Sequence, residues 1–351
     1  MNSTDQQFNF VGQSQTIFPI IEFWWLYLIF ITAILGLIAV DLYYLRRGAR
    51  PNLKNALIYT VGWVSLALIF NVILYYLALW RFTAAPHLAT ELGLTPIEAA
   101  RRVALEYLTG YIIEESLSVD NVFVFVVILN YFAVPPVYQH RVLLYGILGA
   151  IVFRGIFIAL GSVVMKYHVV MILFGALLIL TGAKLCFSSY EKINPEKNLA
   201  IKWLRRFVRI DPHYHKDYFF VRLNGVLHAT PMLVALVALE VTDLIFAFDS
   251  VPAIFAITKE PFVVFSSNIF AILGLRALYF VLAGALHLLH LLKYGLSIIL
   301  IFIGLKMVAL DHLYGGKMPI EYSLSFVVLM LGLFTTLSLI FPKKKRQAPN
   351  G

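Results

Sequence analysis

The sequence predicts an all-α membrane protein of about nine transmembrane helices. Of its 351 residues, 61% are hydrophobic and only 13% are charged, and the mean hydropathy is +0.84. A soluble protein of this length needs more charged residues to cover its surface. Apolar runs of roughly 20 residues recur along the chain, and each can cross about 30 Å of hydrocarbon as a helix. The short alternating segments of a membrane β-barrel do not occur in it.

Nine segments account for the predicted helices, taken in order along the chain. They are residues 18–45, 56–80, 103–132, 142–164, 167–187, 226–257, 263–286, 291–311 and 319–341. The third and sixth are long. Gly110 in the third, and Pro231 and Pro252 in the sixth, predict kinks or tilts. The first 15 residues are polar and lack a basic region, so we expect no cleavable signal peptide.

Basic residues in the connections predict the orientation. The connection at about 190–223 is rich in Lys and Arg, as is the tail after Phe341. Placing both in the cytoplasm puts 18 basic residues of the connections and tail on that side and six on the other, with the N-terminus outside and the C-terminus inside. The net charge of +9 is then explained by membrane orientation, and we expect no nucleic-acid partner.

Self-comparison predicts an internal repeat. Two acidic pairs, Glu114 with Asp120 and Asp243 with Asp249, are related by an offset of 129 residues. Polar residues further along each copy share an offset of 122 residues: Arg154 with Arg276, His168 with His290, and Lys184 with Lys306. Each copy holds three spans, so the second enters the membrane from the opposite side. Transporters built in this way bind substrate at the repeat interface near the midplane.

The repeat divides the chain into five predicted regions. They are an N-terminal tail with peripheral spans 1–2 (1–100), repeat 1 (101–188), a basic cytoplasmic loop (189–224), repeat 2 with spans 6–8 (225–312), and span 9 with a basic tail (313–351).

Six carboxylates lie within the third and sixth predicted spans. An ionised side chain at the bilayer centre costs at least about 2.5–3.5 kcal/mol, so these groups must be paired, protonated, hydrated or bound to a cation. Carboxylate, amide and hydroxyl oxygens without thiolates suit hard divalent cations such as Mg²⁺, Ca²⁺ or Mn²⁺. The candidate metal-binding residues are Asp120, Asp249, Glu115, Glu240, Asp243, Glu114, Asn121 and Ser250.

Several of these residues have a structural alternative. Arg154, Arg276, Lys184 and Lys306 can neutralise repeat acids as ion pairs, although four bases do not balance six acids. Two further residues, Asp41 and Asn71, could add oxygens from outside the repeats.

Three other features have simple structural readings. Asp41 could instead pair with Arg46 or Arg47 at the membrane surface. His287 and His290 have metal-capable spacing but fit an interfacial pair better, and the segment 211–217 with its two histidines fits a solvated loop better than a metal sensor.

The sequence offers no sign of an enzyme. It has one cysteine, Cys186, which excludes an intrachain disulfide and any thiolate cluster. Phosphate-binding loops, dinucleotide fingerprints and Ser/His/Asp sets do not occur. We therefore expect no tightly bound cofactor, and transport driven by a proton or ion gradient.

Two motifs resemble the signatures of the TerC family, in the lysine-exporter superfamily, with most similarity to its Alx-like branch. They are Glu114-Glu-Ser-Leu-Ser-Val-Asp120-Asn-Val-Phe-Val-Phe and Glu240-Val-Thr-Asp243-Leu-Ile-Phe-Ala-Phe-Asp249-Ser-Val-Pro-Ala-Ile, and the resemblance covers roughly residues 20–340. It implies manganese export from the bacterial cytoplasm, a link to tellurium resistance, and a role in transport for the motif acids. Chloroplast relatives imply a second class, membrane-protein insertion.

The functional expectation is therefore a secondary transporter in the bacterial inner membrane. It would export Mn²⁺, as a transported substrate, in exchange for H⁺. One alternative is a membrane-protein assembly or scaffold factor without metal flux. Another is transport of a small organic cation or amino acid, which the few aromatic residues beside the acids disfavour. The sequence does not determine the oligomeric state.

Overall fold

A computed structural model describes residues 16–46, 53–165, 167–187, 209–216, 218–282, 291–310 and 318–341, without the side chains of residues 42–46, 53, 54 and 120. The elements are α1 (Ile20–Arg46), α2 (Leu53–Ala84), α3 (His87–Thr90), α4 (Pro96–Tyr131), α5 (Pro136–Val164), α6 (His168–Phe187), β1 (Arg209–Ile210), β2 (Phe220–Leu223), β3 (Val226–Ala229), α8 (Pro231–Phe255), α9 (Pro261–Leu282), α10 (Leu292–Leu305), the π-helical turn η4 (Lys306–Leu310) and α12 (Ile320–Ile340).

Eight of the described helices are long and apolar enough to cross a membrane: α1, α2, α5, α6, α8, α9, α10 with η4, and α12. The remaining predicted span corresponds to α4. Its 36 residues reach about 54 Å at 1.5 Å per residue, but its acidic side chains make it less apolar than the others. Because α4 packs against α2, α8, α9 and α12, Glu114 and Glu115 lie inside the bundle. The protein is an all-α multi-pass membrane protein, as predicted.

Two long helices begin where local sequence signals place them. Thr95 caps α4, since its hydroxyl accepts from the N–H of Glu98 at 3.3 Å and its own N–H donates to the Glu98 carboxylate at 2.8 Å. This capping box starts the helix at Pro96, seven residues before the predicted start of the third span. Pro231 is the first residue of α8 and does not kink it, whereas Pro252 does lie inside that helix.

A three-stranded sheet, in the order β1-β3-β2, occupies part of the connection between α6 and α8. Strands β2 and β3 form a hairpin closed by Asn224-Gly225, both with positive φ, which is the sequence preferred in two-residue hairpin turns. The sixth span was predicted from residue 226. It begins later, at Pro231, because residues 226–229 pair as a strand. The predicted boundary between the loop and repeat 2 falls within this turn.

Two hydrogen bonds show which helix ends lie together. The hydroxyl of Tyr214, beside the sheet, donates to the carbonyl of Phe132 at the α4–α5 connection, at 2.6 Å. At the other end of the bundle, the N–H of Ile17 donates to Glu260 in the α8–α9 connection, at 2.7 Å. A chain that crosses the membrane at every long helix, including α4, places these pairs of connections on the same side.

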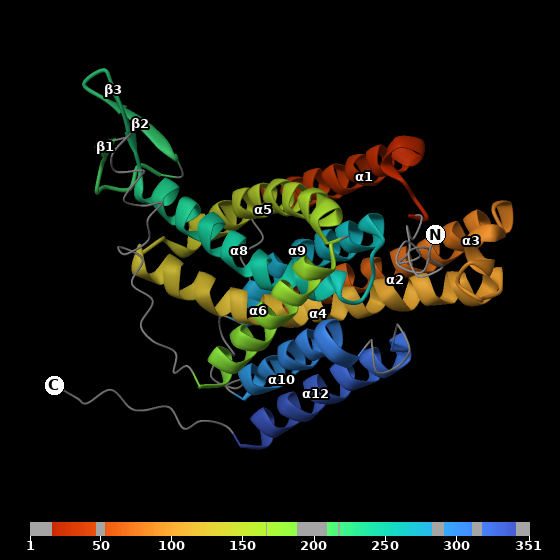
Figure 1. Cartoon of the computed structure of the whole chain (residues 1–351). Helices are drawn as coiled ribbons and strands as arrows, with labels where there is room; N and C mark the ends of the chain where they lie inside the picture. Colours follow the sequence, from red (N-terminus) through yellow and green to blue (C-terminus); the bar gives the residue numbers. More distant parts are fainter. Residues whose placement is uncertain are drawn as a thin grey trace, which may run out of the picture.

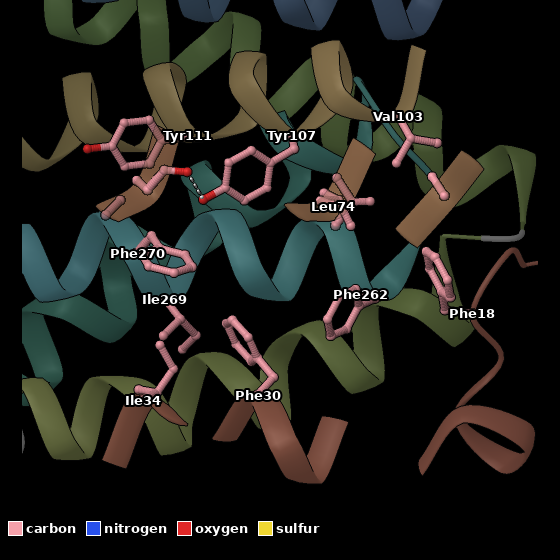
Figure 2. Packing of buried hydrophobic residues seen from close by; sticks show 14 of the residues in the cluster. Phe18, Phe30, Ile34, Leu74, Val103, Tyr107, Tyr111, Phe262, Ile269 and Phe270 are labelled. Carbon is pink, nitrogen blue, oxygen red and sulfur yellow. Dashed lines mark hydrogen bonds between the residues drawn. The ribbon is translucent and has the colours of Figure 1, made fainter. Parts of the chain in front are cut away.

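Helix α9 is the most enclosed of these eight helices: 89% of its most apolar stretch is buried inside the protein, against 11% for α2. Figure 1 shows α10 and α12 on one flank of the bundle and α1 on the opposite flank. Figure 2 shows Phe262 and Phe270 of α9 packed against Phe30 of α1 and Tyr107 of α4. The aromatic packing fixes α9 beside α4, so that polar side chains on both helices can meet.

Helices α6 and α10 cross at small residues. A Cβ at Gly182 would lie 2.8 Å from the carbonyl oxygen of Ser297, and one at Gly175 would lie 3.1 Å from that of Gly304. The offset of 122 residues relates Gly175 to Ser297 and Gly182 to Gly304, so the two contacts interchange. A two-fold axis between inverted repeats would produce this pattern, and it supports the predicted repeat.

Candidate functional site

Arg154 of α5 joins four helices inside the bundle. Its Nη2 donates to Asp243 Oδ1 of α8 at 2.9 Å and its Nε donates to Asp243 Oδ2 at 3.2 Å. Its Nη1 donates to Asn268 Oδ1 of α9 at 2.9 Å and forms an ion pair with Glu114 of α4. The guanidinium therefore fixes the relative positions of α4, α5, α8 and α9.

The cluster around Arg154 carries more negative than positive charge. Arg154 and Glu114 are fully buried and Asp243 is 5% exposed, so solvent screens these charges little. One guanidinium serves two carboxylates, and Glu114 Oε2 has no hydrogen-bond partner. Glu114 and Asp243, both predicted as candidate ligands, are thus placed in charge pairing with Arg154. This is the structural alternative that the sequence left open.

Glu240 precedes Asp243 by three residues on α8 and lies against the backbone of α5. A Cβ at Gly149 would overlap the Glu240 carboxylate, so glycine is needed for this approach. Glu240 Oε2 is buried without a hydrogen-bond partner. Glu240 and Asp243 line a small, partly open pocket with space for about one water molecule, whose other walls are apolar, including Leu143 and Phe125. A proton or a small cation could reach both carboxylates from this pocket.

Glu115 occupies a similar position on α4. Its two carboxylate oxygens would lie 3.5 Å from a Cβ at Gly274 of α9, and its Oε2 is buried without a hydrogen-bond partner. A buried ionised carboxylate that lacks a donor is strongly destabilised. Glu115 and Glu240 therefore need a proton or a cation to stay in the bundle.

Asp249 faces α6. It accepts a hydrogen bond from Thr181 Oγ1 at 3.1 Å, and Lys184 of the same helix is close enough to interact with it electrostatically. An ion pair between Lys184 and a repeat acid stays a prediction. Asp249 is half-buried rather than enclosed, so it keeps access to water or to an ion.

Asp120, the equivalent of Asp249 in the first repeat, lies in α4, but its side chain is outside the described residues. Next to each aspartate is a buried polar group without a partner: Asn121 Nδ2 after Asp120 and Ser250 Oγ after Asp249. Ser118 Oγ is buried and unpartnered as well. Unsatisfied buried groups are rare in folded proteins, so their concentration beside the motif aspartates makes this region part of the candidate site.

Two of the predicted ion-pairing residues have partners outside the repeat acids. Arg276 of α9 pairs with Asp41 of α1, which was predicted either to supply a metal ligand or to pair with nearby arginines. The Lys306 ammonium donates to the carbonyl of Ala256 at 2.9 Å, where a cation is favourable at the C-terminal end of α8. The other accessory candidate, Asn71 of α2, has a buried Oδ1 without a partner.

Among the residues that the structure describes, no group of three or more His, Cys, Asp and Glu side chains could hold a metal ion. His287 and His290 lie outside the described residues. In the sheet region, Asp211 binds both His213 and His215 at 3.0 and 2.6 Å. The hydrogen bonds from these histidines hold the pKa of Asp211 well below its usual range.

Sequence reasoning missed three residues that shape the site. Asn268 is fully buried against Arg154, and a polar run, Ser266-Ser267-Asn268, within an apolar span was the available signal. Gly149 makes room for Glu240, and Gly274 lies beside Glu115 at an ordinary contact distance; only the tertiary packing shows these two contacts.

Glu260, also missed, holds the N-terminal segment at one end of the bundle. Its carboxylate accepts from the N–H groups of Ile17 and Phe18 at 2.7 and 3.1 Å, and the residue is 5% exposed. Burial raises the pKa of Glu260 to about 7. No sequence pattern distinguishes this acid from the others in the connections.

Comparison with known proteins identifies the family. The family described as "Integral membrane protein TerC family" matches residues 99–347. This chain belongs to the TerC family. It is 42% identical over 322 residues to "Uncharacterized membrane protein STKORF319" of Myxococcus xanthus, covering 91% of this chain and 92% of that one. It is 44% identical over 284 residues to "Putative membrane-bound redox modulator Alx" of Escherichia coli (strain K12), covering 80% and 84%. No solved structure matches.

Proposed function

We propose that this member of the TerC family is a secondary transporter. It would export Mn²⁺ or a similar divalent cation from the bacterial cytoplasm across the inner membrane, in exchange for protons. The observation that supports the proposal most strongly is the excess of buried carboxylates around Arg154. This arginine already serves two acids, and Glu240 and Glu115 nearby each hold a buried oxygen without a donor.

The energy of these carboxylates supports cation exchange. Two unpaired ionised acids within the bilayer would cost roughly 5–7 kcal/mol on insertion scales, similar to the whole stability of a small domain. Protons or a divalent cation remove this cost equally well in electrostatic terms. A site that both can neutralise, but that cannot remain empty and ionised, exchanges one for the other.

The donor atoms favour a hard cation. Asp120, Asp249, Asn121 and Ser250 offer carboxylate, amide and hydroxyl oxygens, and the single cysteine of the chain leaves no thiolate set. Because the described side chains do not form a complete ligand group, the transported ion would keep several waters. Rocking of the repeats would bring the motif aspartates to it.

Two other functions make different predictions. The relatives named Alx carry the words "redox modulator", but with Cys186 as its single cysteine this chain cannot form an intrachain dithiol, and we propose transport rather than catalysis. An assembly or scaffold role is favoured by one observation, the ties from Arg154 to three other helices. In that case the acids would only hold the bundle together.

Flux measurements separate transport from scaffolding. Inverted membrane vesicles that contain the protein should take up Mn²⁺ when their lumen is acidic, because protons then leave as the metal enters. Asp120→Asn and Asp249→Asn should each abolish uptake while the protein still inserts. Unchanged flux in both variants would eliminate the proposed site. Lower abundance of the variants together with no metal flux in the parent protein would favour the scaffold function.

A glycine substitution tests the site without changing any charge. Gly149→Ala should displace the Glu240 carboxylate and reduce flux about tenfold or more, since a displacement of about 1 Å from productive geometry can cost a hundredfold. Gly155→Ala is the matched control on the same helix, because its Cβ would make only an ordinary contact of 3.5 Å with Phe265. Equal flux in the two variants would remove Glu240 from the pathway.

A further inference from the structure

The two arginines related by the repeat are used differently. In the repeat, Arg154 corresponds to Arg276 (offset 122) and Asp243 corresponds to Glu114 (offset 129). The counterpart of the Arg154–Asp243 ion pair would therefore be a pair between Arg276 and Glu114. The structure contains the first pair but not the second. Glu114 pairs with Arg154 instead, and Arg276 pairs with Asp41 of α1, a helix outside the repeats. The ion pairs therefore do not follow the two-fold relation between the repeats, whereas the α6–α10 contacts do.

The side chains around each arginine explain this asymmetry. Arg154 is held by the Asn268 amide as well as by acids, whereas the residue equivalent to Asn268 in the first repeat is Gly146, which offers no side chain. Arg276 Nη1 is buried without a hydrogen-bond partner. Arg276 is thus the more weakly held of the two, with Asp41 as the acid that it contacts in this state.

We propose that Asp41 is a positioning residue of the transport cycle: it holds Arg276 away from Glu114, and the opposite-facing state forms when Arg276 exchanges Asp41 for Glu114. This inference rests on the proposed function, and it extends the cycle to α1. In the exchanged state each repeat acid has its own arginine. The polar centre then gains one positive charge, which disfavours a bound divalent cation and promotes its release.

Thiol labelling tests the exchange without measuring transport. In a Cys186→Ser background, a cysteine at Gly146, which lines the pocket beside Glu240 and is partly exposed, reports whether this pocket is open to a membrane-impermeant maleimide. Asp41→Asn should favour the exchanged state and slow labelling at least about fivefold, the lower end of typical coupling between two sites. Adding Glu114→Gln removes the alternative partner of Arg276, so the labelling rate should return toward that of the parent.

Two variants control for loss of structure. Glu22→Gln removes another acid of α1, whose contact with Arg81 is long (3.7 Å) and exposed, and it should label like the parent. Asp41→Glu keeps the charge and should also label like the parent, which shows that the position tolerates change.

The outcomes are distinct from those of the transport test. If Asp41→Asn labels at the same rate as Glu22→Gln, the exchange is wrong, even if Mn²⁺ flux is confirmed. If Asp41→Asn slows labelling and Glu114→Gln reverses the effect, the exchange holds, even if no variant moves metal and the proposed function fails.

Discussion

The crossing of α6 with α10 and the centre around Arg154 both join one repeat to the other, but only the crossing is symmetric between the repeats. At the crossing, the contacts Gly175–Gly304 and Gly182–Ser297 interchange under the repeat offset. Around Arg154 the corresponding ion pairs do not interchange. Close backbone packing depends on small residues that both copies keep. Charge pairing also depends on the neighbours of each arginine, such as Asn268 beside Arg154 and Asp41 beside Arg276, which the two copies do not share.

Removal of Arg154 should have the largest effect. Arg154→Ala leaves Glu114 and Asp243 buried without a cation and should destabilise the protein by about 3–5 kcal/mol, measured by unfolding in mixed detergent micelles. Arg276→Ala leaves only Asp41, which is partly exposed, and should cost less. Equal losses would show that the two arginine sites are equivalent after all.

Alanine at the α6–α10 crossing should have a moderate and symmetric effect. Gly182→Ala and Gly304→Ala both place a Cβ against the backbone of the facing helix and should each destabilise by about 1–3 kcal/mol. Gly332→Ala in α12 has open space around its Cβ and should be neutral or slightly stabilising, because alanine is the better helix former. A large difference between the first two variants would argue against a two-fold axis there.

Glu260 should make stability depend on pH. Its pKa is raised to about 7 in the folded protein, so the folded state binds more protons than the unfolded state between the ordinary value for a glutamate and 7. Stability should therefore fall as pH rises through this window, by at most about 1.4 kcal/mol per pH unit. Glu260→Gln should flatten the slope, and melting temperatures from pH 4.5 to 8 provide the measurement. An unchanged slope would assign it to another group.

Asp211 should show the smallest effect, confined to the sheet. Its pKa is lowered in the folded state, so its contribution is present at neutral pH and lost as pH falls toward that pKa. Asp211→Asn should reduce protection from hydrogen exchange around His213 and His215 without changing the global melting temperature. A global loss of stability would show that the sheet supports the bundle.

The candidate site was predicted from the sequence only in part. The acids of the two motifs were identified because ionised groups are costly in a bilayer, and their repetition at a fixed offset needed no structure. Their partners were not predictable, because Asp41 and Arg276 are 235 residues apart and no local pattern connects them. Asn268 was missed since an amide in an apolar span shows no obvious partner in the sequence.

The sequence by itself determined the membrane class, the family, the acid-rich helices and the excess of acid over base, because hydropathy and charge are properties of local segments. Only the tertiary structure decided which base serves which acid, and which glycine makes room for which carboxylate. A buried charge is compensated by whatever group lies within a few ångströms of it, and side-chain distances across a bundle depend on how all the helices pack together.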